Sequence, residues 1–205
     1  MKEPLMSRKE YTRYRIKHGL LELLTTAHFD VINVSKLSKA SGVTRATFYL
    51  HYSNLMDVVD ELLEDAILDA GENDAAPMNL GVISGVLKRA RTVEELQKAY
   101  ESVYEQLPLC QRISGEPKYI PMFKDPVLAE YIINNLYLKE RPHQVKSLMQ
   151  ELHISESLAE SIFLFCVHGL YAINQRHNWQ RTDEWLHAQQ ALFQFMWAGM
   201  KSLAK

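Results

Sequence analysis

The 205 residues suit one large domain or two small ones, and with 47% hydrophobic and 23% charged residues the chain has the balance of a folded protein with a sizeable core. Two cysteines without a CxxC pair exclude a disulfide framework and a zinc finger, and they fit a reducing compartment. The net charge of −2 hides an asymmetry, because residues 1–54 carry +5 and the remainder −7. An imbalance of this size also arises by chance, but a basic module on an acidic body suits a protein that presents one end to phosphates.

The chain predicts neither a secretion signal nor a membrane span. Its first eleven residues lack an apolar stretch. The longest apolar run, 162–173, is broken by His168 and Gly169 and is shorter than the ~20 residues that a spanning helix needs. The histidines do not have the close spacing of metal ligands, so we expect no metal.

The first predicted helix begins at Ser7, because Ser7 and Glu10 have the spacing of a capping box. Apolar residues then recur at helical spacing up to residue 27. Four basic residues crowd its early turns and fit phosphate contact and a solvated face equally well: Arg8, Arg13, Arg15 and Lys17.

Residues 32–59 predict two short helices joined by a tight turn and followed by a third helix, the shape of a helix-turn-helix. Gly42 stands where the turn needs a positive φ, which glycine adopts at little cost. Asn33 and Thr44 have side chains that cap the two short helices, which we place at 34–40 and 45–50.

The second of these helices is too short to be stable alone, so packing must hold it. Phe48 and Tyr52 are four residues apart and form one apolar face, whereas Arg45 and Tyr49 form another. The first face can anchor the helix while the second meets a ligand as large as DNA.

The remaining predicted elements are all helical. Asn54 caps a helix with Asp57 in its first turn. A break in the pattern at 71–81 divides the chain into a module at 1–54, a connecting helix at 55–71 and a helical body at 72–205. Caps and prolines predict the helices of the body over 92–107, 125–139, 142–153, 155–177 and from 182 almost to the C-terminus.

The string GVTRATFYLHYSN, residues 42–54, resembles the DNA-binding signature of the tetracycline-repressor (TetR) family of transcriptional regulators. The resemblance covers residues 8–70, a third of the chain. It implies an all-α fold, with an N-terminal helix-turn-helix three-helix module and a C-terminal helical ligand-binding and dimerisation domain. It also implies a homodimeric repressor in a bacterial cytoplasm, associated with the nucleoid when it is bound to DNA. Such a repressor binds a palindromic operator in double-stranded DNA until a small organic effector releases it. It implies no cofactor.

Carried over by position, the resemblance implies roles for the residues of the reading surface. Arg45 is the main base reader, because a guanidinium pairs bidentately with guanine O6 and N7. Tyr49 and His51 either bind phosphates and fix the register or pack half-buried against the module. The full implied set is Asn33, Lys36, Thr44, Arg45, Ala46, Thr47, Tyr49 and His51.

Three positions depart from the family pattern, and one of them, Asn33, replaces a frequent threonine cap with a chemically equivalent residue. His28 stands where the family has a glycine at the end of the first helix, so we expect a strained, left-handed histidine there. Leu55 replaces a lysine that begins the fourth helix in the family. The replacement removes a phosphate contact and predicts weaker non-specific DNA affinity without loss of the fold.

The body carries two further predictions. Apolar stripes on the last two helices predict a dimer interface, or else a monomer core, with the candidates Phe165, Gly169, Ala172, Trp185, Ala188, Leu192, Phe195 and Met196. Amphipathic rings suit a pocket for a small organic molecule, although such rings more often form core, and the candidates are Tyr100, Tyr104, Phe123, Tyr131 and Tyr171. We expect the stretch 108–121 to be an irregular pocket wall that holds an inert Cys110.

Two other functions stay open. One is an adaptor of the same fold that a partner protein controls, favoured by Leu55 and by the uncertain pocket. The other is a small helical enzyme, which is disfavoured because the sequence has no paired catalytic carboxylates, Ser/His/Asp set or glycine-rich phosphate loop. We therefore expect a DNA-binding regulator and not an enzyme.

Overall fold

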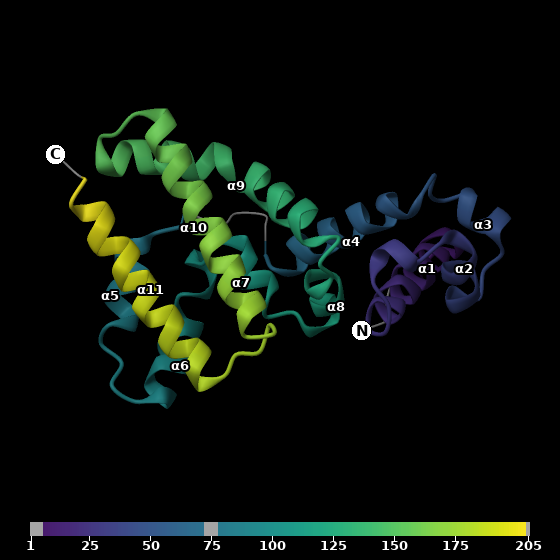
Figure 1. Cartoon of the computed structure of the whole chain (residues 1–205), viewed down its shortest axis with the longest axis horizontal. Coiled ribbons are helices and arrows are strands. Elements are labelled where there is room, and N and C mark those ends of the chain that lie inside the picture. The colour runs from purple at the N-terminus through teal and green to yellow at the C-terminus, as the bar shows by residue number, and fades with distance from the viewer. Residues whose placement is uncertain (1–5, 72–77, 204–205) are drawn as a thin grey trace. The chain divides into compact units, whose positions relative to one another are not determined.

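The computed structural model describes residues 6–71 and 78–203, and within these ranges it contains eleven α-helices, α1 to α11, and no strand (Figure 1). The prediction of an all-α fold is confirmed. Most of the connection predicted at 71–81 lies outside the described residues.

The chain forms two compact units, Met1–Ile67 with Pro117–Glu130, and Leu68–Glu116 with Tyr131–Lys205. The first unit therefore includes most of the helix that we expected to be a connection, together with a segment from beyond residue 100. The chain passes between the units three times: within α4 (Leu55–Asp69), after Glu116, and within α9 (Ala129–Leu152).

The first unit contains α1 (Arg8–Leu24), η1 (Phe29–Val31), α2 (Val34–Ser41), α3 (Arg45–Tyr49), most of α4, η4 (Pro117–Tyr119) and α8 (Ile120–Lys124). Ser7 and Glu10 form the predicted capping box at the start of α1, and the Asn54 side chain accepts the N–H of Met56 at the start of α4. The four main helices share one buried core, which includes Ile16, Leu20, Leu37, Phe48, Val58, Val59 and Leu62.

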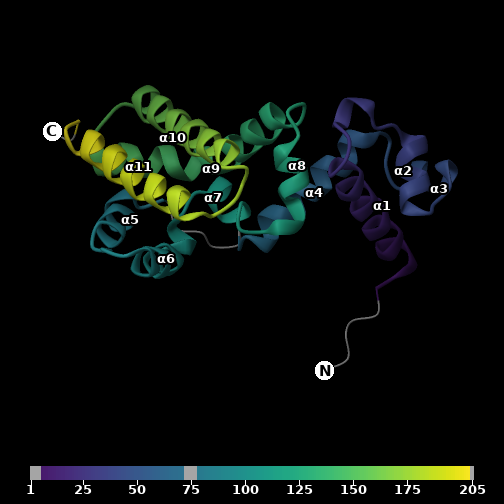
Figure 2. The same cartoon turned by 60° about the horizontal axis from the view of Figure 1, so that its bottom comes forward.

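The second unit contains α5 (Leu80–Leu87), α6 (Val93–Ser102), η3 (Tyr104–Gln106), α7 (Leu109–Ile113), most of α9, α10 (Glu156–Arg176) and α11 (Asp183–Lys201). Thr92, Ser155 and Thr182 cap α6, α10 and α11. The two C-terminal helices lie side by side (Figures 1 and 2). Large buried side chains from several helices fill the core, among them Leu96, Phe163, Trp185 and Phe193.

Three local predictions are wrong. The stretch 108–121 is largely helical and buried, because α7 and the start of α8 occupy it. Pro142 does not separate two helices but lies inside α9, exposed, where water can take the carbonyl that its missing N–H leaves free. His28 is extended, with φ −72°, because the hydroxyls of Thr25 and Thr26 bond the last carbonyls of α1 and close the helix without a left-handed residue.

Among the described helices, α10 is long and apolar enough to cross a membrane by length and composition alone. One such helix is weak evidence of a membrane span, because the mostly buried core helix of a soluble protein passes the same test; 33% of the apolar window of α10 is buried within the protein. This helix includes the run 162–173, which by itself is too short to span a bilayer.

Candidate nucleic-acid interface

The turn between α2 and α3 has the predicted glycine geometry. Gly42 has φ +62°, and its N–H bonds the carbonyl of Lys39 while the N–H of Val43 bonds that of Ser38. These bonds close the end of α2 and turn the chain toward α3. The Arg15 guanidinium on α1 donates to the Gly42 carbonyl at 3.0 Å, so α1 also fixes the turn.

Both predicted caps are present. The Asn33 side-chain oxygen accepts the N–H of Lys36 at 3.0 Å, and the Thr44 hydroxyl oxygen accepts the N–H of Thr47 at 3.0 Å. The hydroxyls of Thr44 and Thr47 are 2.8 Å apart and bond one another. The five residues of α3 are therefore held at their start by side chains that the sequence supplies locally.

The α3 helix has one buried face and one exposed face, as its spacing predicts. Phe48 is fully buried and Tyr52 is 4% exposed, with their ring centroids 5.8 Å apart. Arg45 and Ala46 are exposed, and Tyr49 is 52% exposed although its ring edge contacts Phe48. The apolar face anchors the helix, which leaves the Arg45 guanidinium and the Tyr49 hydroxyl available to a large ligand.

Three other residues that we expect to contact DNA differ in how many of their polar atoms are still available to a ligand. Asn33 is exposed but its oxygen caps α2, and the Lys36 ammonium donates to the Val31 carbonyl at 2.7 Å. His51 is half-buried, and its Nδ1 is buried without a hydrogen-bond partner among the described residues. The backbone N–H groups at the start of α2 and Nε2 of His51 thus remain as candidate phosphate contacts, because the buried Nδ1 cannot reach a phosphate.

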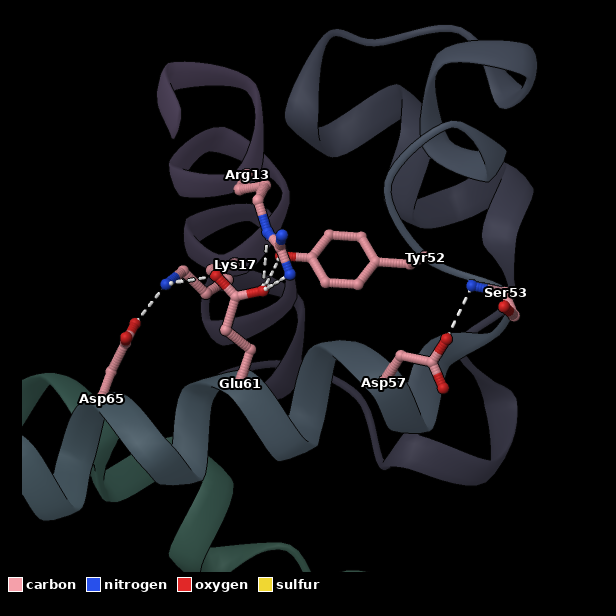
Figure 3. Close-up of polar contacts among 7 residues, drawn as sticks. All are labelled: Arg13, Lys17, Tyr52, Ser53, Asp57, Glu61 and Asp65. Atoms are coloured by element: carbon pink, nitrogen blue, oxygen red, sulfur yellow. Dashed lines mark hydrogen bonds and ion pairs between the residues drawn. The ribbon is translucent and has the colours of Figure 1, made fainter. Parts of the chain in front are cut away.

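An ion-pair network that the sequence did not predict joins α1 to α4 (Figure 3). Arg13 Nε donates to Glu61 Oε2 at 2.8 Å, and Lys17 Nζ lies 3.0 Å from Glu61 Oε1 and also pairs with Asp65. The Tyr52 hydroxyl donates to the same Glu61 Oε2 at 2.8 Å. Arg13 and Lys17 therefore pair with carboxylates of α4 instead of forming a purely solvated face, and contact with phosphates stays a prediction for them.

The network keeps Glu61 ionised. Burial raises the pKa of this carboxyl, but hydrogen bonds from Lys17, Arg13 and Tyr52 outweigh it, and the net pKa is lowered. Burial raises the pKa of the Tyr52 hydroxyl, which remains a donor. A signal was present in the sequence, since Arg13 and Lys17 are four residues apart on one helix, as are Glu61 and Asp65 on another. Their pairing over 48 positions depends on tertiary packing.

The predicted ligand-binding rings are divided between the two units. Phe123 is buried in the first unit, whereas the four tyrosines belong to the second. The hydroxyl of buried Tyr100 donates to Gln111 at 3.0 Å, and that of half-buried Tyr104 donates to the Arg112 carbonyl at 3.1 Å. Tyr171 is buried and Tyr131 is half-buried. Much of this set is core, the alternative that the sequence left open.

The expected redox inertness of Cys110 agrees with its surroundings. The side chain is 1% exposed, and burial raises the pKa of the thiol well above its ordinary value. The thiolate that reacts with oxidants is therefore disfavoured.

The predicted dimer residues divide between the surface and the core. Phe165 and Phe195 are 62% and 67% exposed, and Ala172 is exposed. Three candidates are half-buried: Gly169, Ala188 and Leu192. Trp185 is a core residue whose indole donates to Asn174 at 2.9 Å, and buried Met196 lines the floor of a groove.

That groove lies between α10 and α11 and has a volume of about 340 Å³. Apolar side chains line most of it, including Ile162, Phe165, Phe195 and Met200. Large exposed aromatic side chains around an apolar groove are typical of a surface that binds another protein.

No protein-family model matches the chain, and no curated protein matches it. What the protein does is therefore inferred from the placement of its side chains.

Proposed function

We propose that this protein is a DNA-binding transcriptional regulator of the TetR type, a homodimer that a small organic effector releases from a palindromic operator. The observation that carries the proposal is the two-faced α3 helix. Phe48 anchors it in the core, Thr44 caps it, and Arg45 and Tyr49 stand exposed on its outer face. A short, rigidly held helix with a guanidinium at its start has the form that enters a major groove.

The contacts divide by chemistry. Arg45 reads a guanine edge, and the methyl groups of Ala46 and Thr47 touch a thymine methyl. The Thr47 hydroxyl is already bonded to Thr44, so its methyl is the group left for a base. Tyr49, His51 and the N-terminus of α2 contact phosphates and fix the register.

The test is DNA binding by the purified protein, with fragments from upstream of its own gene, across a salt series. Arg45→Ala should weaken sequence-specific binding roughly tenfold or more, because a bidentate base contact contributes ~1–3 kcal/mol. Arg89→Ala is the matched control, since Arg89 is an exposed arginine of the second unit. Specific binding that survives Arg45→Ala would refute the assignment, and weak binding indifferent to sequence would favour the adaptor.

Homodimerisation is supported by the outer face of α10 and α11. Phe165 and Phe195 expose most of their surface beside the apolar groove. A Cβ added to Gly169 or Gly199 would meet, within 4 Å, no atom of the described residues beyond its own stretch of helix, so packing there does not require either glycine. Both allow the close approach of helices from a second copy, which would bury the exposed rings. Two recognition helices related by a two-fold axis then match a palindrome.

An effector site in the second unit is supported by Gln189 on α11. This side chain is fully buried, yet neither its oxygen nor its nitrogen has a hydrogen-bond partner among the described residues. A buried polar group without a partner destabilises a protein, and a small ligand with a donor and an acceptor can satisfy it.

Gln189→Leu tests this part of the proposal. The free energy of unfolding should rise by about 1–2 kcal/mol, because an unsatisfied amide is replaced by an apolar group of similar size. In a thermal-shift screen of small organic molecules, a compound that stabilises the wild type should lose its effect on the variant. A compound that stabilises both proteins equally would place the site elsewhere.

A further inference from the structure

The loop between α1 and α2 is held by a residue from far along the chain. Asp125 is 3% exposed, and its Oδ2 accepts the N–H of Phe29 at 2.9 Å and lies 3.5 Å from His28 Nδ1. Its other oxygen, Oδ1, accepts the N–H groups of Val127 and Leu128 at 2.9 and 3.1 Å. Oδ1 thus accepts hydrogen bonds from the residues that follow Asp125, and Oδ2 accepts one from the loop between α1 and α2.

The loop leads directly into α2, the first helix of the helix-turn-helix. Phe29 is the first residue of η1, and four residues later Asn33 caps α2. A buried carboxylate forms stronger hydrogen bonds with backbone N–H groups than a neutral acceptor does. The bond from Phe29 to Asp125 therefore holds the start of the short segment that leads to Asn33 and α2.

Asp125 belongs to a segment whose two ends continue into the other unit. Residues Pro117–Glu130 form part of the first unit, where α8 packs on α1. The chain enters this segment from Glu116 and leaves it along α9, which runs on past Tyr131 into the second unit. A helix transmits displacement along its axis, so a change at either end can reach Asp125 through the covalent chain.

We propose that Asp125 is a positioning residue, and that its bond to Phe29 is the contact through which the segment 117–130 couples the second unit to the helix-turn-helix. The expected effect of this contact on DNA binding rests on the proposed function. The coupling itself can be tested without DNA.

The two oxygens of Asp125 allow a selective test. In Asp125→Asn the remaining oxygen can still accept from Val127 and Leu128, but an NH₂ group then opposes the Phe29 N–H. Asp125→Ala loses both sets of bonds. Hydrogen exchange of the free, full-length protein should be faster at residues 29–41 in both variants, by roughly tenfold, because a hydrogen bond to a charged group is lost. Exchange at 127–128 should be faster only in Asp125→Ala.

If Asp125→Asn exchanges like the wild type at 29–41, the residue is only a local cap and the proposal fails. His28→Ala is the matched control, since His28 is exposed and Phe29 keeps its bond to Asp125 in that variant. It should change exchange at 29–41 by less than twofold.

The coupling from the second unit to the helix-turn-helix is tested with a substitution in the second unit. Leu136→Ala opens space in the core beside α9, and Ile133→Val is a milder change on the same helix if the first variant is unstable. Either should speed exchange at 29–41 in the wild-type background and have little effect in Asp125→Asn. An equal increase in both backgrounds, or none in either, would overturn the coupling.

DNA binding separates this inference from the proposed function. With fragments from upstream of the gene, Asp125→Asn should bind roughly tenfold more weakly than the wild type, within the usual range of coupling between sites. If the exchange results hold but even the wild type shows no sequence-specific binding, the proposed function fails and the coupling stands. Unchanged affinity in Asp125→Asn, with wild-type binding intact, would overturn the role of Asp125 in DNA binding.

Discussion

Tyr52 donates its hydroxyl hydrogen bond to Glu61 at 2.8 Å, which joins the residue three positions after α3 to the middle of α4 (Figure 3). The ring of Tyr52 packs on Phe48, and the Arg13 guanidinium lies 5.1 Å from its centroid. One side chain therefore anchors the candidate reading helix through its ring and locates α4 through its hydroxyl. Glu61 accepts bonds from three donors on two different parts of the module.

Glu61→Gln should lower the free energy of unfolding by about 2 kcal/mol at pH 7, because Arg13 loses its carboxylate partner and Lys17 keeps only Asp65. The pKa of Glu61 is lowered in the folded protein, so its contribution is present above the ordinary carboxyl pKa and is lost as pH falls through the folded value. The stability difference between wild type and variant should therefore shrink in strong acid. Urea unfolding at pH 7 and pH 3 measures it.

Glu64→Gln is the control, since Glu64 is exposed on the same helix. It should change stability by less than about 0.5 kcal/mol. If Glu61→Gln were as stable as this control, the charge of Glu61 would contribute nothing to the free energy of unfolding.

The sequence predicted the local features of the module well. Ser7, Asn33, Thr44 and Asn54 act as caps, and Gly42 takes the positive φ, because each of these features depends on residues within a few positions of one another. The burial of Phe48 beside an exposed Tyr49 follows from helical spacing in the same way.

What the sequence did not predict depends on contacts between distant segments. Nothing in the order of residues places Asp125 beside Phe29, which lies 96 positions earlier in the chain. Cations on α1 and carboxylates on α4 were each visible, but their pairing required knowing which faces of two helices meet. The apolar stripe that contains Trp185 fits an interface or a core, and Trp185 lies in the core, because apolar spacing gives the face of a helix and not its partner.

Gly42→Ala should destabilise the protein by about 1–2 kcal/mol, because an L-residue is strained at φ +62° and its Cβ would meet the Arg15 guanidinium. Gly85→Ala, in the exposed interior of α5 with open space around it, should instead stabilise the protein by about 0.5–1 kcal/mol. Thermal unfolding of the two variants should shift in opposite directions. A stabilised Gly42→Ala variant would contradict the turn geometry.

Phe165→Glu should convert a dimer into a monomer, because a carboxylate cannot be desolvated against a second apolar face without a partner. Leu138→Glu is the matched control, since Leu138 on α9 has the same exposed fraction, 62%, and lies outside the groove. Sedimentation velocity at micromolar concentration distinguishes the two states. A dimer that survives Phe165→Glu would place the interface away from this groove, and dissociation by both substitutions would mean that the effect is not specific to it.

Glu140 should make the protein less stable as pH rises through neutrality. Its Oε1 accepts the N–H of Leu109 at 3.1 Å, while Oε2 is buried without a hydrogen-bond partner among the described residues. Burial raises the pKa of this carboxyl to about 7 from an ordinary 4.5, although the Leu109 N–H and nearby Arg112 lower it. The folded state therefore holds a proton between these two values that the unfolded state has released.

Because the pKa is raised, this contribution is fully present below pH 4.5 and is lost as pH rises through about 7, a change of roughly 3 kcal/mol by pH 8. Glu140→Gln keeps an oxygen for the Leu109 N–H but carries no charge, so the variant should gain stability over the wild type as pH rises from 5 to 8. Glu151→Gln, at an exposed position of the same helix, should follow the wild-type curve. Guanidinium unfolding at five pH values gives the free energy of unfolding of all three proteins. Parallel pH curves for wild type and Glu140→Gln would mean that Glu140 is ionised in the folded protein throughout this range.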